Sequence, residues 1–124
     1  MSVFQLFVYG TLRTRERAAS LLQGCECTGI GRVHGTLYDI DGAFPALMLY
    51  GETPVTGEIW RCPAAVLPRL DEYEGVGEGL FRRVATAVTD AADPARELAC
   101  WTYVAGPALA RKLTPDRRTT AWSR

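Results

Sequence analysis

The sequence L-D-E-Y-E-G, residues 70–75, places three carboxylates within four positions, just after an apolar segment punctuated by proline. On an α-helix, residues four apart lie about 40° apart around the axis and residues seven apart about 20°. Glu74 therefore lies on the stripe formed by Leu67 and Leu70, the face that should turn toward the core. By the same geometry Glu72 lies about 160° from Leu70 and belongs in solvent.

Helical geometry alone leaves two environments open for Glu74. If the helix ends only at Gly75, the carboxylate lies beside the core, where burial would raise its pKa and suit it to proton transfer near neutrality. If Gly75 ends the helix earlier, Glu74 points into solvent. Asp71 is intermediate between the two faces.

A second candidate site is V-Y-G-T-L, residues 8–12, between an apolar strand expected over 3–9 and a short helix expected over 15–22. Gly10 allows the backbone to turn sharply and to approach a ligand closely. Main-chain N–H groups left unpaired at such a strand end suit a carboxylate or a developing oxyanion. A purely structural junction is equally consistent with these residues taken alone. The candidate binding residues are Tyr9, Gly10, Thr11 and Leu12.

Turn-forming residues divide the rest of the chain into further elements. We expect two strands within 25–40 broken at Gly29 or Gly31, strands over 44–50 and 55–62 separated by a turn at 51–54, a helix over 63–74 kinked or joined at Pro68, and strands over 80–90 and 97–104. This order predicts an α+β fold with a mixed or antiparallel sheet closing toward a barrel, and short helices packed outside. The 124 residues fit one domain, 1–113, followed by a basic, solvated and partly frayed tail, 114–124.

Composition excludes several functional classes. The formal net charge is zero, so we expect no nucleic-acid partner. No segment approaches the roughly 20 apolar residues of a membrane span, and the N-terminus lacks a signal-peptide pattern, so we expect a cytoplasmic protein. The cysteines are interpreted as reduced core residues and His34 as structural, and we expect neither metal nor cofactor. The cysteines are at positions 25, 27, 62 and 100.

Taken together, the motifs resemble the gamma-glutamyl cyclotransferase-like family. The resemblance lies at V-Y-G-T-L-R (8–13), G-A-F-P-A-L (42–47), L-D-E-Y-E-G (70–75) and L-F-R-R (80–83), in family order. It implies a small mixed barrel with the active site in a cavity at one end. By this resemblance the loop from Tyr9 to Leu12 binds the glutamyl group through backbone amides, and Glu74 is the catalytic glutamate. Phe81 departs from the family, because many relatives carry tyrosine there, and this puts the usual substrate in doubt.

The resemblance implies an enzyme that closes a gamma-glutamyl amine or peptide to 5-oxoproline and releases the amine. The substrate carries its own nucleophile, so one glutamate can perform both proton transfers as general acid and base. We expect a small-molecule substrate and a monomer or weak homodimer. Two alternatives stay open: a non-catalytic binding or regulatory protein of the same fold, and an enzyme that removes a gamma-glutamyl protecting group from a biosynthetic intermediate.

Overall fold

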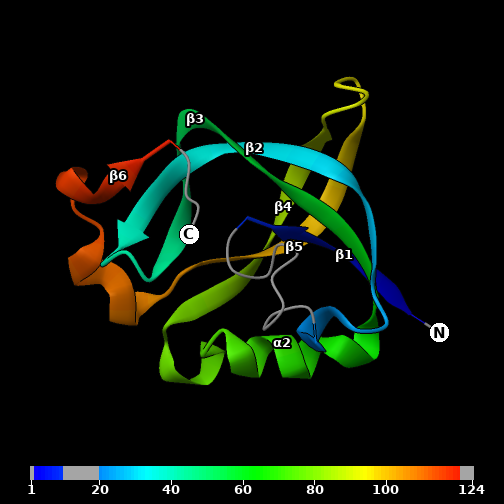
Figure 1. Ribbon diagram of the computed structural model, residues 1–124, viewed down its shortest axis with the longest axis horizontal. Helices are drawn as coiled ribbons and strands as arrows, with labels where there is room; N and C mark the ends of the chain where they lie inside the picture. Colours follow the sequence, from blue (N-terminus) through cyan, green and yellow to red (C-terminus); the bar gives the residue numbers. More distant parts are fainter. Residues whose placement is uncertain (1, 10–19, 121–124) are drawn as a thin grey trace.

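Five β-strands pair around a closed ring in the computed structural model, which describes residues 2–9 and 20–120 (Figure 1). They are β1 (Val3–Val8), β2 (Glu26–Ile40), β3 (Phe44–Pro63), β4 (Phe81–Asp90) and β5 (Glu97–Ala105). The order β3–β1–β5–β4–β2 is closed by pairing of β2 with β3. β1 and β5 run parallel, and the other neighbours in this ring run antiparallel. The fold is therefore a small α+β barrel with a mixed sheet, which confirms the fold class predicted from the sequence.

Short helical segments connect and cover the strands. They are the 3₁₀-helices η1 (Ser20–Leu22), η2 (Ala64–Val66), η3 (Val76–Glu78), η4 (Pro107–Lys112) and η5 (Pro115–Arg117), and the α-helix α2 (Leu67–Tyr73). Pro68 occupies the first turn of α2, where its missing N–H costs no hydrogen bond, so the expected break in this helix is a join between η2 and α2. Most of the helix expected over 15–22 lies outside the described residues. No helix within the described ranges is long and apolar enough to cross a membrane.

Two predicted strand breaks are wrong, because β2 and β3 each continue through them. In β2 the register shifts between Cys27 and Gly29 without ending the strand. In β3, residues 49–52 have no opposite partner in β2, and Gly51 adopts a φ of +92° where a turn was expected. A bulge lets a glycine-containing segment bend while the ladder continues on both sides, so these residues curve the strands toward closure.

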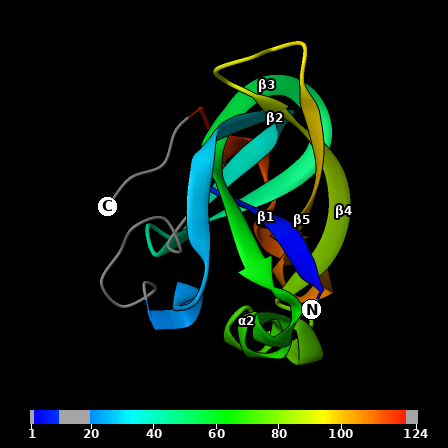
Figure 2. The same cartoon turned by 90° about the vertical axis from the view of Figure 1, so that its right-hand side faces the viewer.

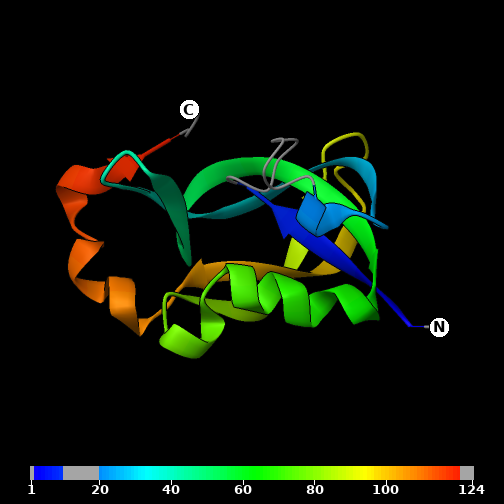
Figure 3. The same ribbon diagram turned by 60° about the horizontal axis from the view of Figure 1, so that its bottom comes forward.

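Alternate residues of β1 belong to two separate cores. Leu6 and Val8 pack in one cluster with Leu70 of α2, which lies along the outer face of the barrel (Figure 3). Phe7 packs with Tyr9 in the other cluster, on the opposite face of the strand and hence inside the barrel. This double burial explains why the sequence of β1 is apolar on both faces.

The described part of the C-terminal region is attached to the barrel. A sixth strand, β6 (Arg118–Thr119), pairs antiparallel with β2, and η5 precedes it. Lys112 and Arg117 both form ion pairs with Asp41 at the turn between β2 and β3. The expectation of a partly frayed segment is therefore wrong for residues 115–119, because β2 offers a strand edge and Asp41 offers a counter-charge. Pro115, Asp116 and Arg118 are exposed, as expected of a solvated segment. The domain boundary at residue 113 stays a prediction.

Candidate active site

Glu74 lies at the C-terminal end of α2, immediately after its last helical residue. Its backbone N–H still donates to the carbonyl of Leu70, at 2.9 Å, so the last turn includes Glu74. Gly75 then takes a left-handed φ of +65°, and a Cβ there would lie 3.0 Å from Leu80 Cβ. A glycine is therefore needed to end the helix at this point. The structure has the first of the two environments that the sequence left open.

The Glu74 side chain is partly buried, and burial raises the pKa of its carboxyl to about 7. Burial also raises the pKa of the Tyr9 hydroxyl, and the nearby charge of Glu74 raises it further. The pKa of Tyr103 is raised by burial, by its hydrogen bond to Asp71 and by the charges of Asp71 and Glu74. The Glu74 carboxylate makes no hydrogen bond or ion pair with any residue that the structure describes. Among the described residues this acid has no counter-ion, and its charge acts on the hydroxyls of Tyr9 and Tyr103.

Asp71, three positions earlier on the same helix, is fully engaged. Arg83 Nε donates to Oδ1 at 2.9 Å, and Arg83 Nη2 donates to Oδ2 at 3.2 Å. The Tyr103 hydroxyl donates to Oδ1 at 2.6 Å, and the guanidinium of Arg83 lies 4.4 Å from the ring centroid of Trp101. The bidentate arginine and the phenol fix this carboxylate in place. Glu72 is exposed, so the three acids of the motif occupy three different environments.

Tyr9 closes the same end of the barrel through its hydroxyl. The hydroxyl donates to the carbonyl of Tyr103 and accepts the backbone N–H of Leu47 at 3.2 Å. Both contacts are buried, so Tyr9 joins β1 to β3 and β5 rather than offering its hydroxyl to a ligand. Three of the predicted binding residues, Gly10, Thr11 and Leu12, lie outside the described residues, and their binding role stays a prediction.

The sequence and the three-dimensional fold were compared with known proteins. Residues 6–124 match the family described as gamma-glutamyl cyclotransferase, AIG2-like. The chain belongs to this family. The family inferred from the four sequence motifs is thereby confirmed. No functionally curated protein sequence matches the chain.

Solved structures with the same fold share about a fifth of their residues with this cyclotransferase-family chain. A mouse AIG2-like protein superposes with a TM-score of 0.79 at 21% identity, over 99% of this chain and 90% of its own. A gamma-glutamyl cyclotransferase superposes with a TM-score of 0.71 at 21% identity, over 84% of this chain and 67% of its own. A protein specific to uropathogenic E. coli superposes with a TM-score of 0.71 at 22% identity, over 97% of this chain and 90% of its own. At these identities the likeness establishes the fold.

Two residues of this cyclotransferase-like site were not found from the sequence. Arg83 belongs to the L-F-R-R motif, but nothing in the motif indicated that it binds Asp71. Tyr103 carried no signal beyond its place in an apolar strand. Phe81, at the departure from the family pattern, is buried with its ring centroid 5.8 Å from that of Phe44. Within the described ranges, no three His, Cys, Asp or Glu side chains gather as a metal site, and metal independence stays a prediction.

Proposed function

We propose that this protein cyclises a gamma-glutamyl amine or peptide to 5-oxoproline and releases the amine, with Glu74 as general acid and base. The observation that carries the proposal is a partly buried carboxyl whose pKa is raised to about 7 and that has no partner among the described residues. Membership of the gamma-glutamyl cyclotransferase, AIG2-like family supports the reaction class. A carboxyl with such a pKa can both accept and donate a proton near neutrality.

The reaction needs two proton transfers and no nucleophile from the protein. Ionised Glu74 accepts a proton from the α-ammonium group of the substrate, and the free amine attacks the γ-carbonyl carbon to close a five-membered ring. Glu74 returns its proton to the departing nitrogen, and the tetrahedral oxyanion collapses as the bond to that nitrogen breaks. The ring nitrogen then passes its second proton to the released amine, which leaves as an ammonium ion, and 5-oxoproline keeps a neutral amide. Main-chain N–H groups of Tyr9, Gly10, Thr11 and Leu12 would hold the α-carboxylate or the oxyanion.

The Asp71 network supports this role by fixing the end of α2. Arg83 lies on β4 and Tyr103 on β5, so both strands hold Asp71 one helical turn before Glu74. The same contacts balance the charge of Asp71, whereas no described residue balances that of Glu74. Positioning of this kind matters because a general base must lie within hydrogen-bond reach of the proton that it abstracts.

The test is a screen of gamma-glutamyl amines, gamma-glutamyl dipeptides and glutathione for 5-oxoproline release, followed by liquid chromatography and mass spectrometry. We expect release from at least one of these classes, in equal molar amount with the free amine. A non-catalytic binding or regulatory protein of the same fold, the alternative left open by the sequence, would bind such compounds without release. Calorimetric binding with no product from any class would therefore overturn the proposal in favour of that alternative.

A further inference from the structure

The barrel has an open seam between β1 and β5. These strands are bridged at Leu6 and Trp101. The other edge of β1 pairs with β3 from Val3 to Val8, and β5 pairs with β4 over its length. Toward the N-terminus the two strands separate (Figures 1 and 2). The facing edges of residues 3–5 and 97–100 therefore have no strand partner among the described residues.

A groove of about 660 Å³ opens at this seam. Its volume lies within the range of small-ligand and peptide sites. Val3, Phe4 and Trp101 supply apolar lining, and the side chain of Val3 is half exposed, at 51%. Main-chain N–H and C=O groups on the free edges need partners, which water or an added strand can provide. The groove therefore combines apolar contact with unpaired backbone.

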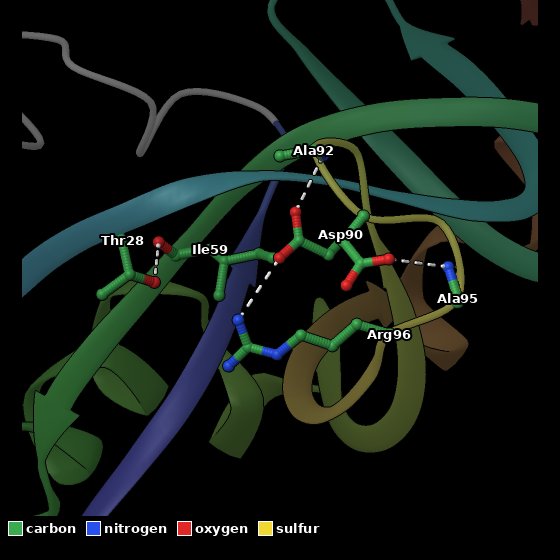
Figure 4. A network of polar contacts seen from close by, with 7 residues as sticks. Thr28, Ile59, Asp90, Ala92, Ala95 and Arg96 are labelled. Atoms are coloured by element: carbon green, nitrogen blue, oxygen red, sulfur yellow. Dashed lines mark hydrogen bonds and ion pairs between the residues drawn. The ribbon is translucent and has the colours of Figure 1, made fainter.

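Two arginines give the groove its charge. Arg61 on β3 and Arg96 just before β5 both line it, and the described residues that line it include no acid. Arg61 is exposed and has no ion pair with the described residues. Arg96 extends to Asp90 (Figure 4), but their N–O distance is 3.5 Å and the Arg96 side chain is 59% exposed. Asp90 is the more buried partner, at 17% exposed, but the arginine side of this long pair lies in solvent. Ion pairs with a solvent-exposed partner contribute at most about 1 kcal/mol, so both arginines can accept a further carboxylate.

We propose that the seam binds an extended acidic peptide, whose main chain pairs with the free edges of β1 and β5 and whose carboxylates contact Arg61 and Arg96. Strand addition to an exposed sheet edge is a general mode of peptide recognition, with affinity from the main chain and specificity from alternate side chains. Side chains of an extended peptide alternate between faces, so acids at every second position would share one face. The bridge at Leu6 and Trp101 limits the depth to which the strand can enter.

This site is separate from the proposed active site. The groove lies beside Val3, whereas the charge of Glu74 raises the pKa of Tyr9, at the other end of the same strand. Six residues of extended chain span about 20 Å. Trp101 contacts both the groove and Arg83, so the test uses the arginines instead. Substitution of Arg61 or Arg96 should leave 5-oxoproline release unchanged, and loss of the proposed activity should not affect peptide binding.

The test uses a fluorescein-labelled, blocked peptide Val-Glu-Val-Glu-Val and fluorescence anisotropy at low ionic strength. We expect saturable binding, and about tenfold weaker binding of Val-Lys-Val-Lys-Val. A Val-Glu peptide N-methylated at alternate residues keeps its charge but loses main-chain donors, and should also bind about tenfold more weakly. Equal binding of the N-methylated peptide would overturn strand pairing, and no saturable binding by the unmodified protein would overturn the site.

Matched variants locate the site on the protein. Arg61→Gln and Arg96→Gln should each weaken binding of the Val-Glu peptide about fivefold, and the double variant more. Arg111→Gln removes the same charge from an exposed residue outside the groove and should leave binding unchanged. Equal losses in all three single variants would show a non-specific charge effect and overturn the assignment. Glutarate that binds as tightly as the peptide would show a small-anion site and overturn the peptide as its ligand.

Discussion

The two ends of β1 lie beside side chains of opposite charge that have few partners among the described residues. At the C-terminal end, the Glu74 carboxylate lies near Tyr9 without a counter-ion among the described residues. At the N-terminal end, Arg61 and Arg96 line a groove to which the described residues contribute no acid. Asp71, on the same helix as Glu74, has the more usual arrangement for a charged side chain, because it forms an ion pair with Arg83. We infer that a charged side chain is available for binding or chemistry where the described residues do not neutralise its charge.

The first prediction tests this comparison on the two acids of one helix. Glu74→Gln should lower the rate of 5-oxoproline release at least about a hundredfold, because it removes the general acid and base. Asp71→Asn, the matched control, should cost much less in rate. Initial rates with a gamma-glutamyl substrate, in variants shown by circular dichroism to be folded, measure the difference. Near-equal losses would mean that the unpartnered acid is not the catalytic one.

The second prediction concerns the pH dependence of the same reaction. The ionised form of Glu74 accepts the first proton, and its pKa is about 7. Below pH 7 we therefore expect kcat/KM to fall about tenfold per pH unit, with a plateau above. A profile between pH 4 and pH 9 measures this. If kcat/KM instead falls only near pH 4.5, the ordinary pKa of a glutamate, burial does not raise the pKa of the group that accepts the proton.

The third prediction compares the two acids by stability, because Glu74→Gln and Asp71→Asn should change the free energy of unfolding in opposite directions. Folded Glu74 keeps its proton up to about pH 7, whereas the unfolded chain releases it near pH 4.5. The folded state binds more protons in this window, so the free energy of unfolding falls as pH rises through it. At pH 8 Glu74→Gln should therefore stabilise the protein by about 1–3 kcal/mol, and this gain should vanish below pH 4.5.

Asp71→Asn should instead destabilise the protein at pH 8 by about 1–3 kcal/mol, because Arg83 loses a charged partner in a partly exposed site. Urea unfolding of both variants at pH 8 and pH 4.5 measures the four values. Destabilisation by Glu74→Gln at pH 8 would show that the ionised carboxylate has a stabilising partner, although none is found among the described residues.

The smallest effect is expected at Tyr9. Tyr9→Phe removes the hydroxyl that accepts from Leu47 N–H and donates to the carbonyl of Tyr103. Two buried backbone groups lose their partner, so the free energy of unfolding should fall by about 1–2 kcal/mol. The rate per folded molecule should change little, because both hydrogen bonds of the hydroxyl are made to main-chain groups of β3 and β5. A large loss of rate with unchanged stability would place this hydroxyl in the chemistry.

Local features of this protein could be predicted from its sequence, and distant partners could not. The end of α2 at Glu74 and Gly75 follows from helical periodicity and a glycine, both of which are encoded within a few residues. The partners of Asp71 come from Arg83 and from Tyr103, 32 positions away, and no local pattern indicates them. Gly51 was misjudged because a glycine that bends a strand resembles a glycine that ends one.

The position of β1 in the ring has a consequence for biosynthesis. β1 is made first, yet one of its neighbours is the last strand of the barrel; Thr102 Oγ1 donates to the carbonyl of Phe7, 95 positions earlier, at 3.0 Å. β2 and β3 pair as a local hairpin that can form while the chain emerges from the ribosome. β1 can pair with β3 once that strand is made, but its edge toward β5 and the apolar side chains that pack on β5 stay accessible to other chains and to chaperones until β5 emerges. Slow translation between β3 and β5 should therefore increase aggregation of the nascent protein.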